Sequence, residues 1–150
     1  MELIVASRAE VEAGLVVRAA YVVISITDPD KRPARIPQPT GWRATLPLRF
    51  HDAVPVELTV FRMPPEVVFM DAGHARQIRE FVDRWRNEVG AIVVHCEQGM
   101  SRSPAVAAAV SEYLGEDSGR FFRQFAPNEH VYQTLRSVLE GDFATGEPRA

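Results

Sequence analysis

The stretch V-V-H-C-E-Q-G-M-S-R-S-P, from Val93 to Pro104, decides how the rest of the chain is interpreted. An apolar, strand-like run ends at His95, a short loop follows, and Pro104 lies in the first turn of an expected helix, where a missing N–H group costs nothing. In open α/β folds, ligands bind beyond the carboxyl ends of strands, where helices begin. A helix N-terminus preceded by a curled loop offers N–H groups and a partial positive charge, so this loop is suited to an anion.

Three residues of this loop carry its chemistry. Gly99 can adopt the positive φ that a curled loop requires. Arg102 presents a planar guanidinium that can hold two phosphate oxygens at once. The same positive field favours a thiolate at Cys96, and a thiolate that faces a bound phosphate is placed for nucleophilic attack. The simpler alternatives are a buried structural thiol for Cys96 and a surface ion pair for Arg102.

The composition limits the class of protein. The chain has 150 residues, of which 46% are apolar and 25% charged, with a net charge of −3. This suits a single domain spanning residues 1–150. One cysteine excludes an intrachain disulfide scaffold and a cysteine-rich zinc site. The scattered arginines argue against a nucleic-acid partner, and no apolar run approaches the about 20 residues of a spanning helix, so we also expect no membrane partner. The N-terminus is unlike a signal peptide, and we expect a cytoplasmic protein.

Strand-like and helix-like segments alternate along the chain. Ser7 and Glu10 form a capping-box pattern at the start of the first helix. The pattern predicts strands at 3–6, 21–26, 44–50 and 91–95, and helices at 8–15, 73–88, 103–114, 121–125 and near the C-terminus. The proline-rich segment 28–42 is either a rim of the site or a connector, with Trp42 a candidate for the edge of the pocket. Segment 55–69 is expected to be a partly ordered excursion. The alternation predicts an α/β fold with a mostly parallel central sheet flanked by helices.

The sequence H-C-x5-R-S at residues 95–103 resembles the signature of the cysteine-dependent protein tyrosine phosphatase superfamily, and C-E-Q-G-M-S-R-S-P is most similar to its small dual-specificity branch. The resemblance extends over residues 91–114, to Ala126-Pro127-Asn128, and to the strand ending in Asp52. It implies a single-domain phosphatase-like fold. It also implies metal-independent and cofactor-independent hydrolysis of phosphate monoesters in proteins through a phosphocysteine intermediate. The monoester would be phosphotyrosine, and also phosphoserine or phosphothreonine.

The resemblance also implies a role for each matching residue. Cys96 would attack phosphorus, and Ser103 would donate a hydrogen bond to the sulfur. His95 would fix the loop, and Asn128 would brace it from the last helix. The phosphate oxygens would be bound by Arg102 and by the N–H groups of Glu97, Gln98, Gly99, Met100, Ser101 and Arg102. Simpler explanations are helix caps for Ser103 and Asn128, and a hydrogen-bonded strand end for His95.

The family also requires a carboxylic acid that protonates the leaving oxygen. Asp52 follows a predicted strand, as the family's acid does, but it lies 44 residues before Cys96, which is farther than the family spacing. Asp71 lies 25 residues before Cys96 and has the position of a helix cap. Glu66 has nearly the family spacing and follows two prolines. Asp52 is preferred, with Asp71 and Glu66 as alternatives.

Two other functions remain open at this point. The displaced Asp52 allows a phosphate-recognising binding module with poor turnover. Sulfur or arsenic redox chemistry is disfavoured because the loop lies late in the chain and there is no second cysteine. Among phosphate esters, Glu97 and the lack of lysine in the loop favour a phosphoprotein monoester over a polyphosphate.

Overall fold

Four parallel strands form one sheet in the order β1-β4-β2-β3 in the computed structural model, which describes residues 1–55 and 66–141. The strands are β1 (Glu2–Ser7), β2 (Tyr21–Thr27), β3 (Trp42–Arg49) and β4 (Ala91–Cys96). The central strand β4 pairs with β1 and β2, so that Ser7 lies opposite Cys96 and Ser25 opposite His95. Because these strands are all parallel, their carboxyl ends meet at a single edge of the sheet, called here the carboxyl edge.

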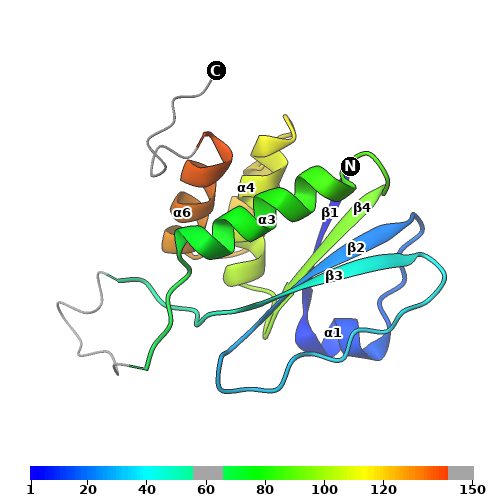
Figure 1. The fold of residues 1–150 in the computed structure, drawn as a ribbon, viewed down its shortest axis with the longest axis horizontal. Helices are drawn as coiled ribbons and strands as arrows, with labels where there is room; N and C mark the ends of the chain where they lie inside the picture. Colours follow the sequence, from blue (N-terminus) through cyan, green and yellow to red (C-terminus); the bar gives the residue numbers. More distant parts are fainter. Residues whose placement is uncertain (56–65, 142–150) are drawn as a thin grey trace.

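Helices cover both faces of this sheet, but unequally. The helices are α1 (Arg8–Ala13), α3 (Ala72–Trp85), α4 (Arg102–Tyr113), α5 (Gly119–Gln124) and α6 (Glu129–Leu139). In Figure 1, α3, α4 and α6 lie over one face and α1 lies on the other. The α/β class and the sheet flanked by helices are therefore confirmed, and the described sheet is parallel throughout.

Strands β2 and β4 lie in the core of the molecule and are almost wholly apolar. Every residue of both strands is buried, as expected for strands that are covered on both faces. Val22, Ile24 and Ile26 join the large cluster beneath the helices, whereas Tyr21 and Val23 face the smaller cluster around α1. Helix α4 is buried on all sides through its first ten residues, so it is fixed firmly behind the loop that precedes it.

Three helices begin at side-chain caps. Ser7 and Glu10 form the expected capping box at α1. Asp71 caps α3 by accepting a hydrogen bond from the backbone N–H of His74 at 3.0 Å. Asn128 caps α6 in the same way. The position of Asp71 as a helix cap, expected from the sequence, is thus confirmed.

Several predicted boundaries need correction. The first helix stops at Ala13 rather than at residue 15, because Gly14 adopts a left-handed φ of 98° and ends it. Helix α3 stops at Trp85, before a turn. Strand β3 starts two residues earlier than predicted, at Trp42. Much of the expected excursion at 55–69 lies outside the described residues.

The expectation that Trp42 borders the pocket is wrong. Trp42 begins β3, and a parallel strand begins at the edge of the sheet opposite its carboxyl end. Its side chain packs against the cluster around α1, and its indole N–H donates to the Thr45 hydroxyl at 2.9 Å. The segment 28–42 is both connector and rim, because its first residues line the pocket and Ile36 packs beside Trp42 in the same cluster.

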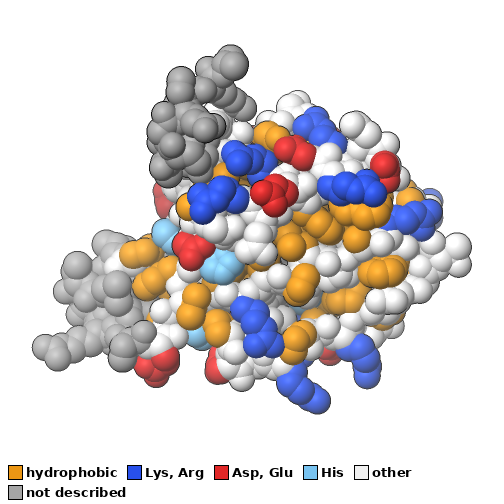
Figure 2. Space-filling model, viewed as in Figure 1, with side chains coloured by type: hydrophobic (Ala, Val, Ile, Leu, Met, Phe, Trp, Pro, Cys, Tyr) orange, Lys and Arg blue, Asp and Glu red, His pale blue; other side chains and the backbone are white. Residues whose placement is uncertain are grey.

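The visible surface carries charges of both signs. On the face shown in Figure 2, arginine and lysine side chains are scattered among acidic and apolar ones rather than gathered into one basic patch. Across residues 1–55 and 66–141, no helix combines the length and the apolar character that crossing a bilayer would need.

Candidate active site

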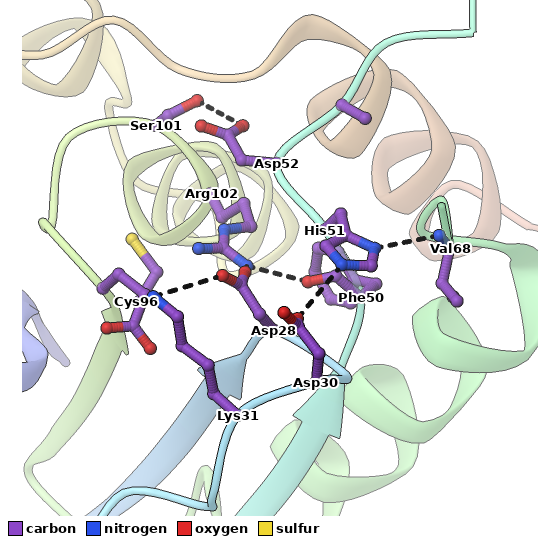
Figure 3. A network of polar contacts seen from close by, with 12 residues as sticks. Asp28, Asp30, Lys31, Phe50, His51, Asp52, Val68, Cys96, Ser101 and Arg102 are labelled. Atoms are coloured by element: carbon purple, nitrogen blue, oxygen red, sulfur yellow. Dashed lines mark hydrogen bonds and ion pairs between the residues drawn. The ribbon is translucent and has the colours of Figure 1, made fainter. Parts of the chain in front are cut away.

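A cavity of about 460 Å³ opens at the carboxyl edge of the sheet. Side chains that follow three different strands meet there, as Figure 3 shows. Its lining comprises Asp28 and Lys31 after β2, His51, Asp52 and Ala53 after β3, Val67, and Cys96, Glu97, Gln98, Met100, Ser101 and Arg102 at the end of β4 and the start of α4. The loop identified from the sequence therefore forms one wall of a real cavity.

The loop between β4 and α4 is held by the end of β1. Gly99 has a φ of 71°, and a Cβ at this position would lie 2.8 Å from the carbonyl carbon of Ala6, so only glycine fits here without strain. The backbone N–H of Arg8 donates to the carbonyl of Glu97 at 3.1 Å, and the Arg8 guanidinium pairs with the Glu97 carboxylate at 3.2 Å. These contacts fix the curl of the loop.

The segment before α6 holds the other end of the loop. The N–H of Ala126 donates to the carbonyl of Met100 at 3.1 Å, and the N–H of Asn128 donates to the carbonyl of Ser101 at 3.0 Å. The carbonyls of Glu97, Met100 and Ser101 are thus occupied, whereas the backbone N–H groups of residues 97–102 meet no acceptor within residues 1–55 and 66–141. A loop with occupied carbonyls and unpaired N–H groups is suited to an anion.

Cys96 is buried, with 2% of its surface exposed, at the base of this loop. Its Sγ lies 3.1 Å from the Ser103 hydroxyl oxygen, and the backbone N–H of Ser103 points to the same sulfur at 3.4 Å. Both groups belong to the first turn of α4. The sulfur therefore has two hydrogen-bond donors available to stabilise a thiolate.

The guanidinium of Arg102 is held through one of its nitrogens, Nη1. Its Nη1 donates to the Asp28 carboxylate and to the Phe50 carbonyl, both at 2.7 Å. Arg102 is only 4% exposed, and its Nε is buried without a hydrogen-bond partner in the part of the chain that the structure describes. A buried donor without a partner is costly, so the Nε edge is suited to an acceptor that enters the cavity. The alternative of a surface ion pair for Arg102 does not apply.

Asp52 lies at the loop despite its distance in the sequence. Its Oδ1 accepts from the Ser101 hydroxyl at 2.8 Å and from the Asn128 side-chain amide at 2.7 Å. Asn128 also donates to the carbonyl of Ala53 at 3.2 Å, while its own Oδ1 caps α6 through Val131. The two sequence interpretations of Asn128, as brace and as cap, both describe its contacts.

The other two acid candidates lie elsewhere. Asp71 is occupied in capping α3 and does not line the cavity. Glu66 lines a neighbouring hollow rather than the cavity that contains Cys96. Of the three carboxylates, the structure brings only Asp52 into contact with the loop.

His95 faces away from the cavity. Its Nε2 lies 2.6 Å from the Ser25 hydroxyl on the neighbouring strand, and its Nδ1 lies 3.2 Å from the Cys96 carbonyl oxygen. Burial lowers the pKa of His95, and the hydrogen bond to the Cys96 carbonyl opposes this only partly. The ring is therefore suited to fixing the end of β4 in a neutral state rather than to moving protons.

The sequence analysis did not identify Asp28, Lys31 or His51 as site residues. Asp28 directly follows a buried strand, so the rule that parallel strands end at one edge could have identified it. Lys31 lies 3.6 Å from the Asp28 carboxylate. His51 immediately precedes Asp52, and its Nδ1 accepts the backbone N–H of Val68 at 3.0 Å.

Comparisons with known proteins agree with this architecture. The human tyrosine phosphatase-like serine/threonine/tyrosine-interacting protein superposes with a TM-score of 0.62 at 20% identity, over 91% of this chain and 89% of that one. A mouse putative dual specificity phosphatase, complexed with zinc tungstate, gives 0.61 at 20% identity, over 96% and 86%. Human DUSP28 gives 0.60 at 20% identity, over 95% and 94%. No protein-family model and no curated protein sequence matches the chain.

These similarities define the class of fold. The chain has the fold of the cysteine-dependent tyrosine and dual-specificity phosphatases, with the sheet and helices arranged as the sequence motif implied. The loop with Cys96 and Arg102 lies at the carboxyl edge of the sheet.

Proposed function

We propose that this protein is a metal-independent phosphatase that hydrolyses phosphate monoesters in proteins through a phosphocysteine intermediate. Phosphotyrosine is the first expected substrate, with phosphoserine and phosphothreonine also accepted. One observation carries the proposal: the Nε of Arg102 is buried and unpartnered in the described structure, in the same loop as the nucleophile candidate Cys96. An oxyanion would satisfy this donor together with the loop N–H groups.

In the first step, the substrate phosphate occupies the loop and the thiolate of Cys96 attacks phosphorus. The S–P bond forms as the P–O bond to the leaving group breaks, and Arg102 with the loop N–H groups stabilises the charge on the equatorial oxygens. Asp52 supplies the proton that the leaving oxygen takes up. Its Oδ1 is occupied by Ser101 and Asn128, so Oδ2 is the oxygen that would carry this proton.

In the second step, water attacks the phosphocysteine. The Asp52 carboxylate accepts a proton from this water while the water oxygen forms a bond to phosphorus. The S–P bond breaks, which returns the thiolate of Cys96. Ser103 stabilises the departing sulfur through its hydroxyl and its backbone N–H. Because the reaction requires a reduced thiol, we place the protein in a reducing compartment, consistent with the cytoplasmic location expected from the sequence.

The direct test is phosphate release from 4-nitrophenyl phosphate and from a phosphotyrosine peptide, measured with EDTA present. We expect turnover by the wild type and complete loss of activity in Cys96→Ser. In assays without EDTA, which chelates vanadate, we expect competitive inhibition by vanadate. The cysteine and serine side chains are similar in size, so circular dichroism serves to show that the variant remains folded. Full activity in Cys96→Ser would refute the proposal.

A second candidate function is phosphate recognition without efficient turnover. One of the similar structures is named a phosphatase-like interacting protein, and Asp52 lies outside the usual spacing for the acid. Fluorescence anisotropy with a labelled phosphotyrosine peptide, followed by a single-turnover assay on the same complex, separates the two functions. Tight binding by the wild type without phosphate release would favour the binding module.

A further inference from the structure

A second hollow adjoins the catalytic cavity. This hollow, which we call the outer subsite, has a volume of about 510 Å³. It is lined by Pro29, Asp30, His51, Glu66 and Val67. Two of these residues, His51 and Val67, also line the cavity that contains Cys96. The two hollows therefore adjoin, so the outer one lies next to a phosphate held in the inner one.

The geometry of His51 fixes Asp30 at this subsite. Because Nδ1 of His51 accepts the N–H of Val68, the ring hydrogen lies on Nε2, which faces the Asp30 carboxylate at 3.4 Å (Figure 3). The Asp30 side chain is nevertheless 74% exposed. Asp30 is thus oriented by the histidine while most of its carboxylate remains accessible to a ligand.

The charges of the two hollows differ. In the inner cavity, Asp28 pairs with Arg102 and Lys31, and Glu97 pairs with Arg8. In the outer subsite, two carboxylates lie with one histidine, and the lining that the structure describes contains no lysine or arginine; the nearby Arg49 donates to the Pro29 carbonyl at 3.3 Å. The outer subsite therefore repels a second phosphate and attracts a cation.

We propose that the outer subsite binds a lysine or arginine side chain next to the phosphorylated residue of the substrate. This rests on the proposed function, because the buried and unpartnered Nε of Arg102 is what anchors the phosphate next to the subsite. Pro29 and Val67 offer apolar contact for the methylene stem of the cation, and Asp30 and Glu66 bind its charged end. The substrate class is then a phosphoprotein segment with a basic flank, rather than a polyanionic phospholipid headgroup.

The test compares kcat/KM for three phosphotyrosine peptides that differ only in the flanking residues, which are arginine, alanine or glutamate. We expect the arginine peptide to exceed the alanine peptide by about fivefold at low salt, because rim charges each contribute modestly and add. The glutamate peptide is expected to be the poorest. The preference is expected to shrink at high ionic strength, as for exposed charges.

The double variant Asp30→Asn, Glu66→Gln is expected to bring the arginine-to-alanine ratio close to one. Glu88→Gln, which removes an exposed carboxylate paired with Arg84 just after α3, is the matched control and is expected to keep the ratio. The ratio is internal to each enzyme preparation, so partial misfolding does not change it.

Three results would overturn the inference: an unchanged ratio in the double variant, a preference for the glutamate peptide, or faster turnover of a short-chain phosphatidylinositol phosphate than of the arginine peptide. Each of these requires an active enzyme. The absence of phosphate release from every ester would instead refute the proposed function, so the two failures are distinguishable.

Discussion

The Asp28 carboxylate lies 2.7 Å from Nη1 of Arg102 and, with the Phe50 carbonyl, holds one end of the guanidinium. The Nε of the same guanidinium is buried and has no partner in the described residues. A planar guanidinium that is fixed at one end presents its remaining donors in a defined direction. Asp28 is therefore a positioning residue for the group that would hold the phosphate.

Asp28→Asn is expected to weaken anion binding by about tenfold. The amide oxygen of asparagine can still accept from Arg102, but a hydrogen bond to a neutral acceptor has about half the strength of one to a carboxylate. The inhibition constants of phosphate and vanadate against 4-nitrophenyl phosphate measure this effect. Asp83→Asn is the matched control, since the Asp83 carboxylate accepts from the Tyr113 hydroxyl at 2.6 Å and does not line the cavity. It is expected to change these constants by less than about twofold. Equal effects of the two substitutions would contradict the positioning role of Asp28.

Asp52→Asn is expected to slow hydrolysis of esters with poor leaving groups by about 10²- to 10⁴-fold, the range for loss of a general acid. Esters with good leaving groups need less protonation and are expected to be affected less. The pH–rate profile of the variant is expected to lose the alkaline limb that reports a protonated acid. Asp71→Asn keeps the cap of α3 and is expected to retain this limb. Loss of the limb in Asp71→Asn instead would move the acid role to that residue.

Ser103→Ala removes the hydroxyl that lies 3.1 Å from the sulfur of Cys96. A hydrogen bond to a charged group contributes about 1.5–3 kcal/mol, so release of the thiolate is expected to slow by about 10- to 100-fold. Formation of the phosphocysteine is expected to change less. Stopped-flow measurements are expected to show a burst of leaving group before a slow steady state, and a steady state without any burst would argue against this role.

Gly99→Ala and Gly115→Ala form a matched pair. Both glycines have positive φ, at 71° and 80°, but only at Gly99 would a Cβ meet other atoms, 2.8 Å from the carbonyl carbon of Ala6. Gly115→Ala is expected to lose about 1 kcal/mol of unfolding free energy from backbone strain alone. Gly99→Ala is expected to lose more and to weaken vanadate binding, because the loop must move. Urea denaturation and vanadate inhibition test the pair, and an equal loss for both variants would show that the loop tolerates the added methyl.

His95 predicts a pH dependence of stability. Its pKa in the folded chain is lowered by burial from the ordinary value of 6.5. As the pH falls, the unfolded chain therefore takes up the His95 proton at a higher pH than the folded chain does. The free energy of unfolding is expected to be highest above pH 6.5 and to decrease as the pH drops below it. Ser25→Ala keeps the ring and is expected to keep this slope, whereas His95→Asn is expected to reduce it. Denaturant titrations between about pH 5 and 7 give the slopes.

The sequence predicted the fold because its strongest signals are local. The buried strand, the glycine-containing loop and the helix around Cys96 follow one another in the chain, and the alternation of strands and helices requires parallel pairing. The helix cap at Asp71 and the capping box at Ser7 are equally local, and both were predicted.

Long-range contacts were less accessible. Asp28 and Arg102 are separated by 74 residues, and a spacing in the sequence does not indicate which strand ends will be neighbours. Trp42 was misplaced for the same reason. It follows the loop whose start lines the cavity, but it begins its strand at the opposite edge of the sheet. The position of Asp52 beside the loop was predicted because Asp52 follows a strand, although its spacing from Cys96 is longer than the family spacing.

The burial of Cys96 has a practical consequence for handling the protein. The residue is 2% exposed and lines the anion cavity, so a peroxide molecule that enters this cavity meets the site that an oxyanion would occupy. A phosphate-containing storage buffer is therefore expected to preserve the thiol while it suppresses the measured rate. Two preparations of equal purity could then differ in activity according to the salt in which each was kept.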